Sequence, residues 1–171
     1  LPIKNVAYTP CFRKEAGSWG AHVRGLNRLH QFDKVEIIQI ENPEKSSKTL
    51  HEMCAHVESL IKLLELPYRK VLLCSGDLGF SSSITYDFEV YAPGQKKWLE
   101  CSSVSNFKTY QTNRMNIKVK AGSGKKLAHT LNGSALALPR IVAAILENNQ
   151  EKEKIHIPKV LHSYTGFNSI S

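Results

Sequence analysis

Hydrophobic and polar side chains alternate most clearly between residues 84 and 91. Ile84, Tyr86 and Phe88 fall on one side of this segment, and Thr85 and Asp87 fall on the other. Successive side chains of a strand point to opposite faces, so the segment is predicted to be a half-buried strand. Further strands are expected at residues 3–13, 29–41, 68–74 and 97–103, with a hairpin formed by residues 115–120 and 127–131.

A helical period replaces this alternation in two segments. Apolar residues spaced three and four apart predict an amphipathic helix that opens at residues 42–44 and ends at 66–67. A second helix is predicted to run from Ser134, as its N-cap, to about Gln150, with Pro139 in its first turn. A short helix is expected at residues 106–113, and the chain from Glu151 onward is predicted to be a basic, loosely ordered tail.

The composition fits one domain with an anionic partner. The chain has 171 residues, of which 42% are hydrophobic, and a formal net charge of +8, which favours RNA or a nucleotide as a partner. Its 4 cysteines are widely separated and include no C-x-x-C pair, so we expect reduced thiols in the cytoplasm rather than a zinc site. No membrane span or signal peptide is predicted, and the missing initiator methionine indicates part of a longer chain.

One predicted surface carries opposed charges around an aromatic ring. Strand alternation places Arg13 and Glu15 on one face, and Arg28, Phe32 and Glu36 on one face of the returning segment. A rigid guanidinium suits phosphate or carboxylate oxygens, so this set suits a ligand with a phosphate, an amine and a flat base. The alternative is a hairpin whose outer face is covered with salt bridges.

The loop between these two strands, residues 16–27, combines glycines, an exposed tryptophan and cations. Such a loop suits contact with the end of a nucleic acid through stacking and charge, and the alternative is an ordinary long hairpin loop. The glycine-punctuated segment 75–80 lacks the Lys-Ser/Thr ending of a phosphate-binding loop, so we discount it.

Two further features indicate a phosphate ligand with a metal. A tight turn at 93–94 would bring Asp87 close to Glu100, and Mg²⁺ between the carboxylates would relieve their repulsion. The alternative is a shifted register in which Lys96 or Lys97 neutralises them. Arg140 lies in the first turn of the last helix, where a cation is unfavourable unless it faces a ligand phosphate; the alternative is a plain surface arginine.

Three long segments resemble one enzyme family. The sequences FR-x-EAGS, RGL-x-R-x-HQF and KVE within residues 12–36 resemble motif 2 of the class II aminoacyl-tRNA synthetases, in the form used by seryl-tRNA synthetases. WLECSSVSNFKTYQTNRMN resembles the segment before motif 3, HTLNGSALALPRIVAAILENNQ resembles motif 3, and IPKVLHSYTGF resembles the terminal segment. One departure is Ala135, where a glycine is usual in class II motif 3.

The resemblance implies an α+β fold, with an antiparallel sheet flanked by helices, and a bound ATP. Arg13 would bridge the α-phosphate and the serine carboxylate, and it is implied as catalytic together with Arg140. Glu15 would accept a hydrogen bond from the adenine amino group near Leu29, and Phe32 would stack on the base. The full set of implied ATP-binding residues is Arg13, Lys14, Glu15, Arg28, Leu29, Phe32, Glu100, Cys101, Ser102, Ser103 and Arg140.

The resemblance also implies sites for Mg²⁺ and L-serine. Glu100 and Ser103 would bind the metal, although strict alternation places them on opposite faces, so the strand is expected to bend or end there. Serine would be bound by Arg13, by Glu36 at its ammonium group, and by Asn132 and Ser134 at its hydroxyl group.

The implied activity is ligation of serine to its tRNA, with the acceptor end near residues 16–27, in a homodimeric cytoplasmic enzyme. The family's Thr-x-Glu loop, motif 1 and N-terminal tRNA-binding arm all precede motif 2, so the 171 residues are expected to bind serine poorly and to be nearly inactive alone. The alternatives are a ligase that charges a carrier protein and a non-catalytic paralogue, although the retained Arg13, Arg28 and Arg140 argue against the latter.

Overall fold

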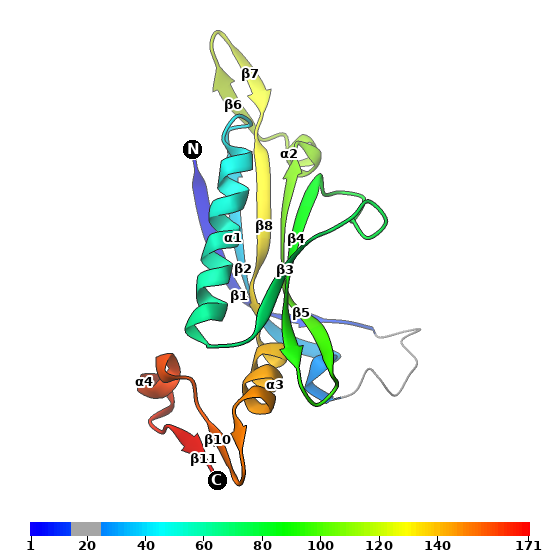
Figure 1. Ribbon diagram of the computed structural model, residues 1–171. Coiled ribbons are helices and arrows are strands. Elements are labelled where there is room, and N and C mark those ends of the chain that lie inside the picture. The colour runs from blue at the N-terminus through cyan, green and yellow to red at the C-terminus, as the bar shows by residue number, and fades with distance from the viewer. Residues whose placement is uncertain (15–24) are drawn as a thin grey trace.

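The computed structural model describes residues 1–14 and 25–171. Its main element is an antiparallel sheet of 6 strands in the order β1-β2-β8-β5-β4-β3 (Figure 1). Strand β4 alternates between apolar and polar residues as the sequence predicts, with Phe88 and Val90 buried on one face and Asp87 and Glu89 on the other. Their bounds are Ile3–Phe12 (β1), Gln31–Glu41 (β2), Tyr68–Leu72 (β3), Ile84–Ala92 (β4), Lys97–Lys108 (β5) and His129–Ala137 (β8).

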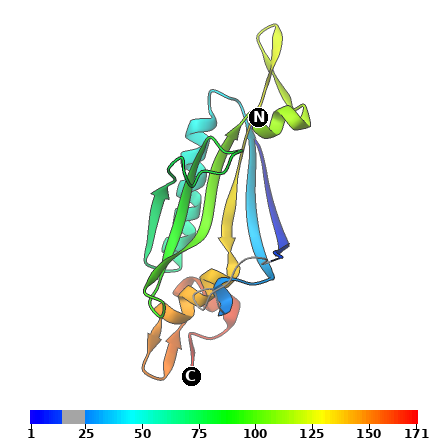
Figure 2. The ribbon, with the colours of Figure 1, turned by 90° about the vertical axis from the view of Figure 1, so that its right-hand side faces the viewer.

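Helix α1, Ser46–Leu63, lies along the apolar face of this sheet (Figures 1 and 2). The side chains of the predicted stripe are buried there against Phe88, Val104 and Leu131, so the predicted amphipathic helix is confirmed. Helix α3, Leu138–Asn148, follows β8 directly and adds Ile141 and Ile145 to the same core. The α+β class with an antiparallel sheet flanked by helices is therefore confirmed.

Smaller elements extend beyond both ends of the sheet. At one end lie helix α2, Tyr110–Met115, and a hairpin of β6, Lys118–Ala121, with β7, Gly124–Leu127 (Figure 1). At the other end is the short helix η1, Gly25–Asn27, together with the C-terminal segment. The C-terminal segment consists of β9, Gln150–Glu151; β10, Lys154–His156; η2, Lys159–Leu161; α4, His162–Thr165; and β11, Ser169–Ile170.

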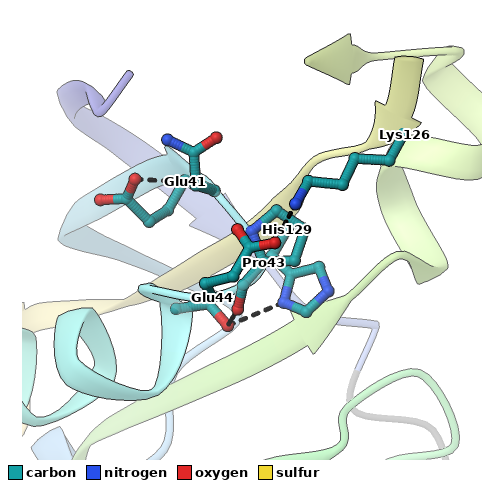
Figure 3. A network of polar contacts seen from close by, with 7 residues as sticks. Glu41, Pro43, Glu44, Lys126 and His129 are labelled. Carbon is teal, nitrogen blue, oxygen red and sulfur yellow. Dashed lines mark hydrogen bonds and ion pairs between the residues drawn. The ribbon is translucent and has the colours of Figure 1, made fainter. Parts of the chain in front are cut away.

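A polar network attaches the hairpin to the start of α1 (Figure 3). The Ser46 hydroxyl lies 2.7 Å from Nδ1 of His129 and donates to the carbonyl of Pro43 at 3.1 Å. Lys126 of β7 forms an ion pair with Glu44. Burial lowers the pKa of His129, with Lys108 as the next contributor, so the neutral imidazole is favoured in this network.

Four predicted boundaries are wrong. Strand β5 continues to Lys108 because its residues pair with both β4 and β8, so the next helix begins at Tyr110 and not at residue 106. Ser134 lies within β8, and the N-cap of α3 is Ala137. The hairpin strands are 118–121 and 124–127, whereas 129–131 belong to β8. The tail expected to be loosely ordered pairs into the 3-stranded sheet β11-β10-β9.

None of the helices in the described part of the chain is long and apolar enough to cross a membrane.

Candidate active site

The face of the sheet opposite α1 is polar at its centre. Thr85 on β4 lies opposite Ser105 on β5, and their hydroxyl oxygens are 2.7 Å apart. Asn132 on β8 is paired with Ser105, and Ser134 follows two residues later on the same face. Burying such polar side chains contributes little to the stability of a sheet, because they lose their hydrogen bonds to water. This face is therefore the one on which a polar ligand would be accommodated.

A cleft of about 430 Å³, counting the space continuous with solvent, opens at the end of this polar face. Strands β2, β5 and β8, the short helix η1 and the start of α3 all contribute to its wall. The lining residues are Arg13, Leu26, Asn27, Arg28, Leu29, Phe32, Lys34, Glu100, Cys101, Ser134, Ala137, Pro139 and Arg140.

Arg13 and Phe32 come together through the pairing of β1 and β2. Cys11 lies opposite Phe32, and the amide of Arg13 donates to the carbonyl of His30 at 2.8 Å. Because Arg13 is two residues beyond Cys11, its side chain points to the same face as Phe32. The guanidinium carbon lies 4.7 Å from the centre of the Phe32 ring, within the range of a cation–π contact.

Arg140 reaches the same cleft from the first turn of α3. Its Nε donates to the carbonyl of Asn27 at 3.1 Å, and its terminal nitrogen donates to the carbonyl of Glu100. Burial is the main cause that lowers the pKa of Arg140; nearby Glu100 opposes this shift, and Arg13 and Arg28 add to it. Three guanidinium groups therefore lie close enough to repel one another, and an anionic ligand would relieve that repulsion.

A second cavity, shallow and widely open to solvent, lies next to this cleft along β2 and β8, and it is lined by Glu36, Ile38, Gln111, Arg114, Met115 and Asn132. The Ser134 hydroxyl, which lines the cleft, donates to Oε2 of Glu36 at 3.2 Å and so connects the two spaces. Burial raises the pKa of Glu36, against the opposing effects of Lys34 and Ser134. A carboxylate held in this way favours a cationic ligand group that restores the lost solvation.

The predicted pair of carboxylates is rearranged by a β-bulge. Phe88 pairs with Ser102 but Glu89 pairs with Glu100, so Cys101 is an extra residue on β5. The bulge places Glu100 and Ser103 on one face, which confirms that the strand departs from regular alternation there, although it does not end. Glu100 thus lies directly opposite Glu89, while Asp87 lies opposite Ser103.

Neither lysine neutralises these carboxylates. Lys97 pairs with Ala92 at the far end of the hairpin, so the alternative with a shifted register is wrong. Glu89 instead forms an ion pair with Arg69 of β3. Burial raises the pKa of Asp87, a hydrogen bond from Ser103 lowers it, and Glu100 raises it further. The Oδ1 atom of Asp87 is buried and has no hydrogen-bond partner within residues 1–14 and 25–171.

The donor set around Glu100 fits magnesium only in part. A carboxylate, a serine hydroxyl and the nearby Asp87 oxygen are hard ligands of the type that Mg²⁺ takes together with water and ligand phosphates. The described residues contain no group of three or more His, Cys, Asp or Glu side chains arranged to hold a metal ion on their own. Any Mg²⁺ bound here would therefore depend on a ligand to complete its coordination.

The other predicted residues are divided between the cleft and the core. Leu29 lines the cleft, and Lys14 is exposed at the edge of the described region, whereas Glu15 and residues 16–24 lie outside the described residues. Cys101 lines the cleft although it is buried, and burial raises the pKa of its thiol to about 12. Ser102 lies on the core face, where its hydroxyl donates to the carbonyl of Ser134 at 2.5 Å.

Some lining residues were not predicted from the sequence. Lys34 lies between Phe32 and Glu36 on the same face of β2, so strand alternation could have identified it. Gln111, Arg114 and Met115 belong to α2, and only the three-dimensional packing of that helix against β8 brings them to the second cavity.

Comparison with known proteins identifies the family. Residues 1–149 match the family described as tRNA synthetase class II core domain (G, H, P, S and T). The serine–tRNA ligase of Methylacidiphilum infernorum is 55% identical over 166 residues, which are 96% of this chain and 39% of that protein. The enzyme of Salinibacter ruber is 52% identical over 170 residues, which are 98% of this chain and 40% of that protein.

Comparison with solved structures finds class II tRNA synthetases as well. Seryl-tRNA synthetase from Pyrococcus horikoshii, complexed with ATP, has a TM-score of 0.95 at 43% identity and is matched over 99% of this chain and 39% of its own. Prolyl-tRNA synthetase from Cryptosporidium parvum, with a TM-score of 0.76 at 14% identity, shares the fold. The chain spans about 40% of the length of the curated relatives it matches. The predicted resemblance is confirmed: this chain belongs to the class II tRNA synthetase core-domain family and is similar over nearly its whole length to serine–tRNA ligases.

Proposed function

We propose that the chain forms part of the catalytic core of a serine–tRNA ligase, which activates serine with ATP and transfers it to tRNA. The observation that carries this proposal is the convergence of Arg13, Arg28 and Arg140 with the Phe32 ring in one cleft, beside the half-buried carboxylate of Glu36. Cations, an aromatic surface and an adjoining anionic pocket match ATP and an amino acid bound side by side.

The nucleotide would lie in the larger cleft. Phe32 offers its ring to the adenine, with Leu29 beside it, and Glu15 is the proposed acceptor for the adenine amino group. Arg13 lies beside the ring, at the place where the α-phosphate follows the nucleoside, while Arg28 and Arg140 hold the outer phosphates. Lys14, Cys101 and Ser102 remain assigned to the nucleotide; because the last two side chains are buried, they would contribute through the backbone.

Magnesium is proposed at the end of the cleft, bound by Glu100 and Ser103 on the face created by the bulge. When bound there, it would neutralise charge on the ATP phosphates. Asp87 accepts a hydrogen bond from Ser103 and so holds this hydroxyl oxygen in place.

Serine would occupy the second cavity and extend to Arg13. Glu36 would take the ammonium group, and Arg13 the carboxylate. Asn132 and Ser134 would meet the hydroxyl group from adjacent positions on β8. A site that hydrogen-bonds a hydroxyl can reject an analogue without it by roughly 10⁴-fold, because its polar groups would be left without partners.

The proposed chemistry needs orientation more than acid–base catalysis. The serine carboxylate oxygen attacks the α-phosphorus, the bond to the bridging oxygen breaks, and pyrophosphate leaves with the electron pair. A ribose hydroxyl of the terminal tRNA nucleotide then attacks the acyl carbon, loses its proton and releases AMP. The arginines position the phosphates and compensate their charge in both steps.

The tRNA acceptor end is proposed to approach residues 16–27, where Leu26 and Asn27 already border the cleft. The net charge of +8 supports an anionic partner of this kind. A homodimer and a cytoplasmic location belong to the same proposal and rest on the family alone.

Serine-dependent exchange of pyrophosphate into ATP tests the proposal, in a polypeptide that supplies the remaining length of the curated relatives. Arg140→Ala is expected to lower kcat by about 100-fold or more, because a guanidinium that donates hydrogen bonds to the ATP phosphates is lost. Lys120→Ala, on the β6–β7 hairpin, is the matched loss of charge and should change little. Wild-type protein without serine-dependent exchange contradicts the proposal, while exchange without transfer to tRNA would favour a ligase that charges a carrier protein.

A further inference from the structure

Gln111 lies in the wall of the proposed serine pocket and contacts two residues of β8. Its side-chain oxygen Oε1 accepts a hydrogen bond from the Thr130 hydroxyl at 2.6 Å and another from Nδ2 of Asn132 at 3.3 Å. Both Gln111 and Asn132 line the second cavity, while Thr130 is buried. The three residues form a short chain of polar contacts that ends at the proposed ligand.

In the structure, the Nδ2 end of the Asn132 amide is the end that contacts Gln111. An amide side chain carries a donor group and an acceptor oxygen, and it can rotate to exchange them. With Nδ2 donating to Gln111, the Oδ1 atom of Asn132 has no partner among the described residues and remains available as an acceptor. The reverse orientation would place Oδ1 of Asn132 against Oε1 of Gln111, where two acceptors repel.

Helix α2 holds Gln111 in a fixed position beside β8. The neighbouring Thr112 is fully buried, and its hydroxyl donates to the carbonyl of Ala128 at 2.6 Å, which anchors the helix to the start of β8. Gln111 therefore approaches β8 from a fixed position.

We propose that Gln111 is a positioning residue for substrate specificity: it orients the Asn132 amide so that Oδ1 accepts a hydrogen bond from the hydroxyl group of the amino-acid substrate. This rests on the proposed function, in which serine lies beside Asn132. The Thr130 hydroxyl donates to the same oxygen of Gln111 that accepts from Asn132, so both contacts agree with one orientation of the Gln111 amide.

Three variants separate this role from a merely structural one, with kcat/KM measured for serine and for alanine by pyrophosphate exchange. Gln111→Met keeps the size but removes the acceptor, so the preference for serine over alanine should fall about tenfold, the value of roughly one hydrogen bond. Gln111→Glu can only accept, so it keeps Asn132 in the same orientation and should retain the preference. Asn113→Met, at an exposed position of the same helix, is the control.

A double-mutant cycle supplies the second measurement. In an Asn132→Ala background, Gln111→Met should change kcat/KM for serine by less than about twofold, because the group through which it acts is gone. An unchanged preference in Gln111→Met, a full loss in Gln111→Glu, or an equal effect of Gln111→Met in both backgrounds would overturn the inference. Wild-type protein without serine-dependent exchange would instead refute the proposed function, so the two failures are distinguishable.

Discussion

Replacing Gly133 with alanine tests how closely the two central strands must approach. A Cβ atom at this position would lie 2.8 Å from the carbonyl oxygen of Ser103 and 2.9 Å from both Cα and Cγ2 of Val104. Two of these atoms belong to the backbone of β5, so no side-chain rotation can relieve the overlap. The strands β5 and β8 would have to move apart where Val104 and Gly133 are paired.

The cost follows from that geometry. Forcing an extra methyl group into a packed interior typically costs about 1–3 kcal/mol, and a contact with backbone on a central strand belongs in the upper part of this range. We expect about 3 kcal/mol, which corresponds to a fall of about 1.5 M in the urea midpoint if the slope is about 2 kcal/mol/M. The measurement is urea unfolding followed by circular dichroism, with the slope compared between variants.

Gly124→Ala is the control, because its Cβ would meet only the carbonyl of Ala121 at 3.8 Å, an ordinary contact. Its free energy of unfolding should stay within about 0.5 kcal/mol of the wild-type value. If Gly133→Ala unfolds at the same urea concentration as the control, the close approach of β5 and β8 does not constrain this position and the reasoning fails.

Two further predictions concern titratable groups. The pKa of His129 is lowered in the folded protein from its ordinary value of 6.5, so between the folded pKa and 6.5 the unfolded chain binds more protons than the folded one. The free energy of unfolding should therefore fall as the pH drops through this range. In urea titrations, His129→Gln should flatten this pH dependence. Burial raises the thiol pKa of Cys54 to about 11 and that of Cys101 to about 12. Maleimide at pH 8 should therefore label the exposed Cys74 rapidly and leave Cys54 and Cys101 unmodified until urea unfolds the protein, as measured by mass spectrometry. Fast labelling of Cys101 in the native protein would contradict its burial.

Much of the framework could be predicted because it depends on local periodicity. The stripe of α1 follows the helical repeat, and most of it is buried, with Leu60 and Leu64 partly buried at its end. Arg13 and Phe32 meet because strand alternation and a hairpin pairing suffice to place them. Arg140 was marked by an unfavourable charge in the first turn of a helix, and it faces the cleft as expected.

Other features depend on tertiary pairing that no local pattern reveals. Ser134 has the residue type and position of an N-cap, but its hydroxyl donates to Glu36 and its backbone belongs to β8, paired with β2. The mixed sequence at 104–108 shows no clear strand alternation, yet hydrogen bonding to two neighbouring strands holds it extended. Gln111 reaches its partners from a separate helix, so only the folded arrangement identifies it.

Two β-bulges explain why strict alternation fails at the site, and a third register shift occurs between Asn106 and Lys108 of β5. Cys101 is an extra residue that brings Glu100 and Ser103 to one face of β5. On β8, the step from Ser134 to Ala137 spans three residues opposite the two-residue step from Glu36 to Lys34.

The bulge on β8 sends Leu136 into the core, although it lies two residues beyond Ser134, while Ala137 lines the cleft. A regular strand would put Leu136 and Ser134 on the same face and would lose either a core side chain or a polar one from the cleft. Because of these two bulges, β5 and β8 place some side chains in the core and others in the wall of the cleft. Both bulges lie where the proposed nucleotide and serine sites meet, as expected for bulges that redirect side chains beside an active site.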